Sequence, residues 1–359
     1  RAAAELRHRI RAELGRAAAR ARDDGDTERA SELRALARQT DRAWVSTIHG
    51  FCRRLLAAHP AAAGLDPRFR VLAEAEAERL REQAALEAIE QLIAEGDDAV
   101  RRAAAAYRPE RLAGMALQAH ERLRNQGMAD PKLPEVGEPR RSVKQDGEEP
   151  EPLTPRERAA AVEARAALEA VLERLHSRYE ELKAVRSGLD FLDLELRALA
   201  LLRSSEAIAS RWRERFLHIL VDEFQDTNRV QLKLIEALSG PRTRLFTVGD
   251  ENQSIYRFRN ADLEVFRAAR ERARGSPDTE IHPLRGNFRS RPEVLAAANA
   301  VGRALIPRFP ELEAGADPAG EPRAELLLTW DESPRKSKWA EVEEELGRDE
   351  GSDEPPSVS

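Results

Sequence analysis

The first 39 residues carry apolar side chains at helical spacing. Leu6, Ile10 and Leu14 recur every four residues in a segment rich in Ala, Arg and Glu, which is the period of one helix face. The stretch "DDGDTE", residues 23–28, interrupts this pattern with Gly and Asp, which favour turns. The pattern predicts two helices joined by a short turn.

A longer helical pattern runs from about residue 66 to residue 210. Ala, Glu, Arg and Leu dominate this segment, and it has almost no run of the residues that favour strands. A Pro-rich and charge-rich loop at about 130–157 interrupts it. The segment is predicted to be a large all-helical insertion in an α/β domain.

Strand patterns flank the helical segment. Ahead of it, "AWVSTIHGF" reads as a short buried strand that ends near Thr47 to His49 and is followed by a helix. After it, "FLHILVDE", "RLFTVGDENQSI" and "IHPLRGNFRSRPEVLAAANAVG" each begin as a strand and continue as a helix, and "AELLLTW" is a last strand candidate. Such alternation is typical of an α/β fold with a parallel sheet.

The composition fits a soluble globular chain of two or three domains. Of the 359 residues, 41% are hydrophobic, 35% are charged and 5% are aromatic, and the net charge of -6 does not decide whether nucleic acid is a partner. The single cysteine, Cys52, excludes an internal disulfide framework and is expected to be a small buried apolar residue. Neither a membrane span of about 20 apolar residues nor a secretory signal occurs, so a cytoplasmic protein without membrane contact is expected.

Two carboxylates follow an apolar run directly. Asp222 and Glu223 come after "ILV" at residues 219–221, and Asp226 follows shortly. Burying carboxylates is costly, so they need a cation, a partner or water. An Asp-Glu pair at the carboxyl end of a parallel strand suits one carboxylate that holds Mg²⁺ and another that orients or deprotonates a water. For an isolated pair, a solvated strand end is the alternative.

Polar residues also end two other predicted strands, and the carboxyl ends of parallel strands meet at one edge of a sheet. These residues are Thr47 and His49 after the first strand, and Gly249, Asp250 and Gln253 after the strand at "RLFTV". Ligand-binding groups are therefore predicted to converge at this edge.

Several stretches resemble a known family. "VDEFQDTN" resembles motif II, "VGDENQSIYRFRNA" motif III and "LRGNFRSRPEV" motif IV of the UvrD/Rep-type superfamily 1 DNA helicases, in the family's order and spacing. "STIHGFCRRLL" is similar to the DNA-contacting Thr-x-His segment, and "RAAAELRHRI" to the second half of motif Ia. "GLDPRFRVLAEAEAERL" and "LDFLDLELRALALL" make the chain most similar to the AddA/RecB branch, whose members unwind broken DNA ends for recombinational repair. The resemblance spans about residues 1–330.

The resemblance implies a RecA-like P-loop NTPase core, an α/β fold with a parallel sheet, that contains the all-helical insertion. The first RecA-like domain is then divided by the insertion, and a second RecA-like domain begins after motif III. The expected parts are residues 1–65 and 211–280 for the first RecA-like domain, 66–210 for the 1B-like insertion, 281–330 for the start of the second RecA-like domain, and 331–359 for a polar tail.

For ATP, the resemblance implies that Asp222 is the Mg²⁺-associated carboxylate and that Glu223 activates water for attack on the γ-phosphate. Gln253 becomes a γ-phosphate sensor. Arg289 is similar to the family's arginine finger, and Phe288 beside it would stack on the adenine. Taken alone, Arg289 could equally form a surface salt bridge.

For DNA, the resemblance assigns Thr47 and His49 to backbone contacts. It assigns Tyr256, Phe258 and Arg259 to a platform that stacks bases and meets phosphates of single-stranded DNA. Core packing of Phe258 and a structurally paired His49 are the alternatives.

The implied function is a 3′–5′ ATP-dependent DNA helicase or translocase that acts as an AddA/RecB-like subunit in double-strand break repair and recombination. Its implied cofactors are ATP and Mg²⁺, and its implied partners are single-stranded DNA, end-bearing double-stranded DNA and an AddB/RecC-like subunit. The chain has no Gly-x-x-x-x-Gly-Lys-Ser/Thr phosphate loop and no motif V or VI, and Arg1 opens an apparent helix, which together predict a fragment that is inactive alone.

Two other functions stay open at this point. A non-enzymatic DNA-binding or assembly subunit with a degenerate helicase core is the first. A metal nuclease centre at the acids is the second, and it would need further acids and a nearby lysine that no compact motif after Asp222 supplies.

Overall fold

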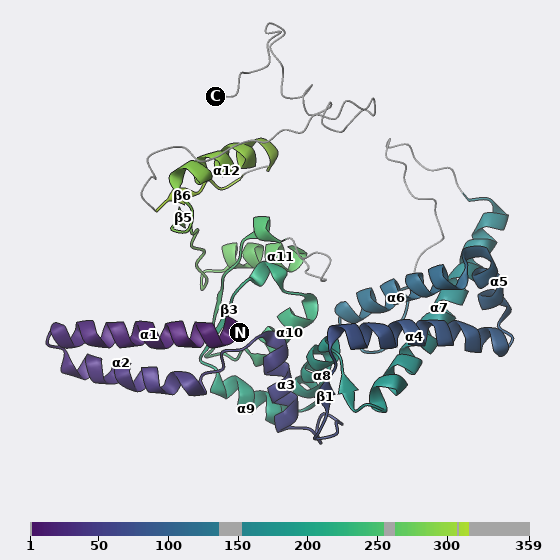
Figure 1. Ribbon diagram of the computed structural model, residues 1–359, viewed down its shortest axis with the longest axis horizontal. Helices are drawn as coiled ribbons and strands as arrows, with labels where there is room; N and C mark the ends of the chain where they lie inside the picture. Colours follow the sequence, from purple (N-terminus) through teal and green to yellow (C-terminus); the bar gives the residue numbers. More distant parts are fainter. Residues whose placement is uncertain (1, 136–152, 255–262, 307–308, 316–359) are drawn as a thin grey trace, which may run out of the picture. The chain divides into compact units, whose positions relative to one another are not determined.

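The computed structural model describes residues 2–135, 153–254, 263–306 and 309–315. The chain divides into two compact units, Arg1–Thr279 and Glu280–Ser359, and each is described by itself. The described residues are mostly helical and contain three small parallel sheets, which agrees with the α/β class predicted from the sequence (Figure 1). Among the described helices, none combines the length and the apolar character needed to span a membrane.

The first unit begins with a helical hairpin. Helices α1 (Ala2–Asp23) and α2 (Thr27–Gln39) pack side by side, and a 3-10 turn, η1 (Thr40–Arg42), follows them (Figure 1). Gly25 turns the chain with a φ of 83°, and the Asp26 side chain then accepts a hydrogen bond from a backbone N–H of the first turn of α2. The predicted break between two helices is confirmed.

The strand expected at "AWVSTIHGF" is wrong, because α3 (Ile48–Ala58) begins inside that stretch. The Thr47 hydroxyl accepts a hydrogen bond from the Gly50 N–H at 3.2 Å and so caps the helix. Trp44 packs edge-on against Trp212, with ring centroids 4.9 Å apart. The prediction had instead placed Trp44 in a strand of a sheet. Helix capping and aromatic packing explain why this strand-like pattern does not form a strand.

Four helices form most of the segment that was expected to be helical. They are α4 (Glu74–Ala94), α5 (Asp98–Tyr107), α6 (Pro109–Asn125) and α7 (Pro155–Ala184). Their shared core is rich in alanine, for example Ala88, Ala116 and Ala167, whose short side chains let the helices approach closely. In Figure 1, α4, α6 and α7 lie alongside one another.

Two short strands in this segment were not expected. β1 (Arg70–Val71) and β2 (Gly188–Leu189) pair in parallel at the two ends of the helical group. A Cβ atom at Gly188 would lie 2.6 Å from a methyl carbon of Leu72, so any larger residue would force the buried Leu72 side chain to move. Strands of two residues are too short to produce a periodic sequence pattern.

The rest of the first unit alternates helices and strands. In chain order, the elements are α8 (Phe191–Ser204), α9 (Glu206–Arg215), β3 (His218–Val221), η2 (Phe224–Asp226), α10 (Arg229–Leu238), β4 (Arg244–Thr247), η3 (Glu251–Gln253) and α11 (Leu263–Arg274). β3 and β4 pair in parallel over four residues each, as the predicted fold class requires. Apolar residues of α3, α8, α9 and α10 form one core cluster, which includes the buried Cys52, as expected.

β3 is not the fully buried strand that its apolar run predicted. Ile219 packs against the core cluster, but Leu220 is 72% exposed, and its neighbour in register, Phe246, is 58% exposed. Successive side chains of a strand point to opposite faces of the sheet. β3 therefore contacts the core cluster with one face, and the described residues leave its other face and all four residues of β4 exposed.

The described residues of the second unit form a strand-helix-strand element. β5 (Gly286–Asn287) and β6 (Glu313–Ala314) pair in parallel, and α12 (Pro292–Leu305) lies between them in the chain. The predicted strand-loop-helix order is present here, although the strand is only two residues long. The last predicted strand, residues 324–330, and the tail at 331–359 lie outside the described residues.

Candidate functional site

The loops that follow β3 and β4 are joined by backbone hydrogen bonds. The Val248 N–H donates to the Val221 carbonyl at 2.9 Å, and the Phe224 N–H donates to the Val248 carbonyl at 2.8 Å. The first loop carries Asp222 and Glu223 and continues as η2, while the second leads into η3. The predicted carboxylates thus lie at the carboxyl ends of paired parallel strands.

A buried amide, Gln225, connects the two loops. Gln225 is 1% exposed, its Nε2 donates to Glu223 Oε2 at 2.7 Å, and its Oε1 accepts from the Asp250 N–H at 3.0 Å. Asp250 Oδ2 in turn accepts from Gln253 Nε2 at 2.9 Å. A continuous path therefore runs from Glu223 through Gln225 and Asp250 to Gln253. Gln225 was not among the predicted site residues, and its place between acids in "DEFQDT" was the only signal for it.

Glu223 has a left-handed backbone conformation, with a φ of 51°. This conformation costs a non-glycine residue about 1–2 kcal/mol, and such strain is frequent at functional sites. Both Asp222 and Glu223 are exposed, and Asp222 Oδ1 accepts from the Glu223 N–H at 3.1 Å. The strained residue, Glu223, is thus the one that was predicted to activate water.

The oxygen atoms at this site fit Mg²⁺ chemically. Mg²⁺ is usually held by one or two carboxylates together with waters and substrate phosphates, and Asp222 and Glu223 supply carboxylates. Asp226 Oδ1 is buried without a hydrogen-bond partner among the described atoms, and burial together with the charge of Glu223 raises the pKa of Asp226. Within the described residues, no group of three or more His, Cys, Asp or Glu side chains is placed to hold a metal ion. Ligands beyond these side chains would have to complete the coordination.

The path between the loops requires glycine at position 249. A Cβ atom there would lie 2.6 Å from Gln225 Oε1 and 3.0 Å from the Gln225 backbone nitrogen. We expect Gly249→Ala to displace Gln225 and to lower the free energy of unfolding by about 1–3 kcal/mol, measured by chemical denaturation. Gly15→Ala is the matched control, because nothing lies within 4 Å of the added carbon and alanine favours a helix. Unchanged stability of Gly249→Ala would contradict the close contact with Gln225.

The predicted DNA-contacting residues Thr47 and His49 lie at the start of α3 and do not follow a strand, contrary to the prediction. The Thr47 hydroxyl caps the helix. His49 Nε2 lies 2.9 Å from Oε1 of the buried Glu195, and the imidazole contacts the Phe191 ring at a centroid distance of 4.9 Å. His49 is therefore paired with Glu195 in the structure. Its ring is partly exposed, and its contact with DNA stays a prediction.

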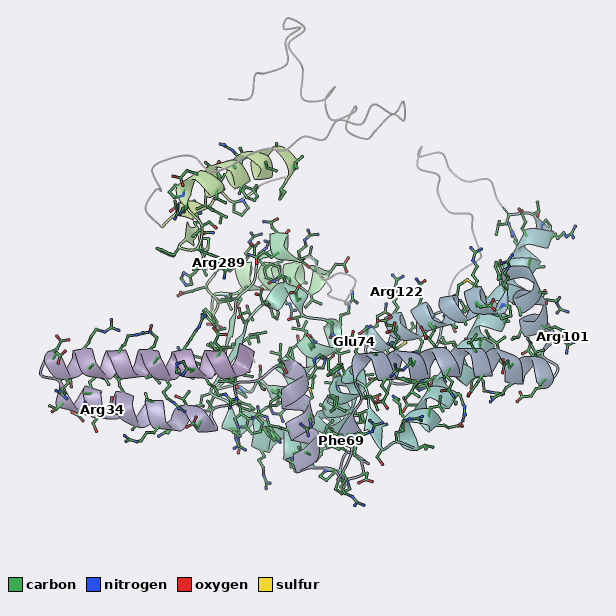
Figure 2. The ribbon with its side chains drawn as sticks, viewed as in Figure 1. Arg34, Phe69, Glu74, Arg101, Arg122 and Arg289 are labelled. Carbon is green, nitrogen blue, oxygen red and sulfur yellow. The ribbon has the colours of Figure 1, made fainter. Side chains whose placement is uncertain are left out.

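Arg289 and Phe288 belong to the second unit and are both exposed (Figure 2 labels Arg289). Asn287 Oδ1 accepts from the Arg289 N–H at 3.0 Å and from the Ser290 N–H at 2.8 Å, which fixes the turn before α12. The role of Arg289 as an arginine finger stays a prediction. The other predicted DNA contacts, Tyr256, Phe258 and Arg259, lie outside the described residues.

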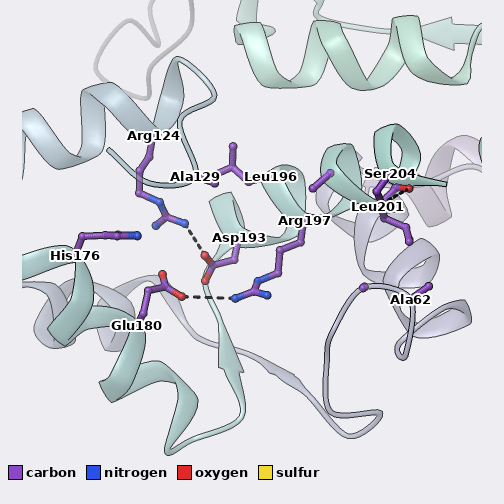
Figure 3. A pocket seen from close by; sticks show the side chains of 12 residues that line it. Ala62, Arg124, Ala129, His176, Glu180, Asp193, Leu196, Arg197, Leu201 and Ser204 are labelled. Carbon is purple, nitrogen blue, oxygen red and sulfur yellow. Dashed lines mark hydrogen bonds and ion pairs between the residues drawn. The ribbon is translucent and has the colours of Figure 1, made fainter. Parts of the chain in front are cut away.

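A buried ionic network that the sequence did not predict lies where α6, α7 and α8 meet. The Arg124 guanidinium lies 3.0 Å from Asp190 Oδ2 through Nη1 and 2.5 Å from Asp193 Oδ1 through Nη2. Lys183 Nζ lies 2.5 Å from Asp193 Oδ2. The Tyr179 hydroxyl donates to Asp190 Oδ2 at 2.9 Å. Burial alone would raise the pKa of Asp190, but the charges of Arg124 and Lys183 hold that pKa below its usual value. Figure 3 shows Arg124 pointing toward Asp193 beside a cavity of about 390 Å³. We call these five residues the Arg124 network.

The comparisons with known proteins agree on one family. A family model for the UvrD/REP helicase N-terminal domain matches residues 1–274. A probable DNA helicase II homolog of Mycoplasma pneumoniae is 34% identical over 149 residues, which are 42% of this chain and 20% of that protein. A probable DNA helicase II homolog of Mycoplasma genitalium is 39% identical over 123 residues, 34% of this chain and 17% of that protein.

A third relative supports the similarity to AddA. The exonuclease/helicase subunit RexA of Streptococcus pneumoniae serotype 4 is 37% identical over 129 residues, 36% of this chain and 10% of that protein. The chain matches between a tenth and a fifth of the length of these relatives. The family model, in contrast, covers well over half of the 359 residues. This chain therefore belongs to the UvrD/REP helicase family and is similar to AddA-type helicase/nucleases.

Proposed function

We propose that the chain is a part of the helicase core of an ATP-dependent DNA helicase or translocase that moves 3′–5′. The observation that carries this proposal is the hydrogen-bonded path from Glu223 to Gln253, at the ends of two paired parallel strands within the matched family region. Such a path suits an enzyme that must align a water-activating carboxylate with a group that senses phosphate. Similarity to the exonuclease/helicase subunit RexA supports a role as an AddA/RecB-like subunit in double-strand break repair and recombination.

The proposed architecture is a RecA-like core with a helical insertion. Pairing of β3 with β4 and the packing of Ile219 of β3 against the helical core cluster support the core, and the alanine-rich helical group supports the insertion. The proposed parts are residues 1–65 and 211–280 for the first RecA-like domain, 66–210 for the insertion and 281–330 for the start of the second RecA-like domain.

In this proposal, Asp222 would hold Mg²⁺ and Glu223 would take a proton from the attacking water. Bound ATP and Mg²⁺ supply the phosphoryl group and neutralise charge on the phosphates. Gln225 holds the Glu223 carboxylate from one side with its N–H group. Since Gln225 also binds the loop that leads to Gln253, the position of Glu223 depends on the loop that senses the γ-phosphate.

Arg289 is proposed to act on the phosphoryl group of ATP, and Phe288 to stack on the adenine. A guanidinium is always charged and presents a planar fork of donors, which suits a phosphoryl group in the transition state. Both side chains are exposed in the described structure, which is compatible with an approach to ATP.

The proposed DNA partners are single-stranded DNA and end-bearing double-stranded DNA, and an AddB/RecC-like protein is the proposed partner subunit. Thr47 and His49 would contact the DNA backbone from the start of α3. Tyr256, Phe258 and Arg259 would stack bases and bind phosphates, since aromatic faces accept any base.

The 359-residue chain alone is expected to show no DNA-stimulated ATP hydrolysis, because its sequence contains no phosphate-binding loop with a lysine. Phosphate release is measured with and without single-stranded DNA, and a longer protein that carries this chain together with such a loop is the active comparison. Turnover by the chain alone that disappears in Glu223→Gln would contradict this expectation. DNA binding by the longer protein without ATP hydrolysis would favour the non-enzymatic subunit.

A further inference from the structure

Glu195, on α8, is a buried carboxylate that the proposed mechanism does not use. It is 1% exposed, yet side-chain N–H groups of three residues reach its two oxygens. Gln231 Nε2 donates to Oε1 at 2.7 Å, Asn228 Nδ2 donates to Oε2 at 3.2 Å, and His49 Nε2 lies 2.9 Å from Oε1. Because Glu195 is shielded from water, these three donors supply the hydrogen bonds that offset the cost of burying its carboxylate.

The three donors come from two elements with different proposed tasks. His49 lies on α3, in the segment proposed to contact DNA. Asn228 and Gln231 form the capping box of α10, which begins directly after the loop at 222–227. Asn228 Oδ1 accepts from the Gln231 N–H at 2.8 Å, so the Asn228 amide uses its oxygen for the helix start and its nitrogen for Glu195.

We propose that Glu195 is a positioning residue that couples DNA binding at His49 to the loop carrying Asp222 and Glu223. This inference rests on the proposed function. DNA that engages the exposed part of the His49 ring acts on the same imidazole that Glu195 holds. Water cannot replace a donor that is lost at a buried carboxylate. Movement of His49 therefore changes how Glu195 holds Asn228, and Asn228 directly follows the loop at 222–227.

Hydrogen exchange of the full 359-residue chain, with and without an oligothymidine, tests this coupling. In the wild-type chain, DNA is expected to slow exchange of the backbone amides at 222–231 by at least about fivefold, the lower range of coupling between sites. Glu195→Gln keeps the shape of the side chain but turns one acceptor into a donor that faces other donors. The protection is therefore expected to be lost in Glu195→Gln.

Glu236→Gln is the matched control, because it makes the same chemical change at an exposed residue of α10 and should keep the wild-type protection. If Glu195→Gln does not fold, Asn228→Ser replaces it, since serine retains an oxygen for the helix cap and lacks the Nδ2 donor. Protection that persists in the folded variant would overturn the coupling. DNA binding by the wild-type chain without protection of 222–231 would also overturn it, and absence of DNA binding would overturn the proposed function together with the coupling.

Discussion

Glu223→Gln is expected to lower the ATP turnover of a longer helicase that carries this chain by at least about 100-fold, the scale for loss of a positioned general base. ATP binding should stay nearly intact. The amide has almost the same shape as the carboxylate, and its oxygen can still accept the hydrogen bond from Gln225 Nε2, which measures 2.7 Å in the wild type. What the amide cannot do is take a proton from water at neutral pH.

Steady-state phosphate release and nucleotide affinity are measured together for this variant. Glu236→Gln serves as control, because Glu236 is exposed and lies 3.6 Å from Arg272, on a surface that the proposed chemistry does not involve. Near-normal turnover of Glu223→Gln with weakened nucleotide binding would show that Glu223 acts in binding and that another group activates the water.

The helices were predictable where their pattern is long. The break at Gly25 and the helical segment after residue 66 follow from local periodicity and turn residues, and these are properties of neighbouring positions. The stretch around Trp44 misled the prediction, because a mixture of apolar and β-branched residues suits both a strand and an aromatic cluster beside a helix start. An apolar run likewise shows that Leu220 can be buried, but it does not show which element would cover it.

The candidate site was predictable only in part. Asp222 and Glu223 were identified because acids after an apolar run are unusual, and a family motif contains them. Gln225 and Glu195 were missed, since their importance comes from partners far along the chain, such as Asp250 for Gln225. Hydrogen bonds between distant polar residues leave no periodic trace, so the structure was needed to find both side chains.

The Arg124 network should give the largest effect on stability. Arg124→Met is expected to lower the free energy of unfolding of the chain by about 3–5 kcal/mol, because it leaves the buried carboxylates of Asp190 and Asp193 without their main counter-charge. Chemical denaturation measures the change. Arg9→Met is the matched control, since Arg9 pairs with Glu5 in solvent and such pairs contribute at most about 1 kcal/mol.

A double variant separates lost charge compensation from lost packing. Asp190→Asn keeps an oxygen that can cap α8, as Asp190 does now for the Asp193 N–H at 2.6 Å, while it removes one of the two buried negative charges. If uncompensated charge causes the destabilisation, Arg124→Met combined with Asp190→Asn should cost less than the sum of the two single changes. Additive losses would instead assign the effect to packing of the Arg124 side chain. A loss in Arg124→Met no larger than that in Arg9→Met would show that the network does not hold α6 to α8.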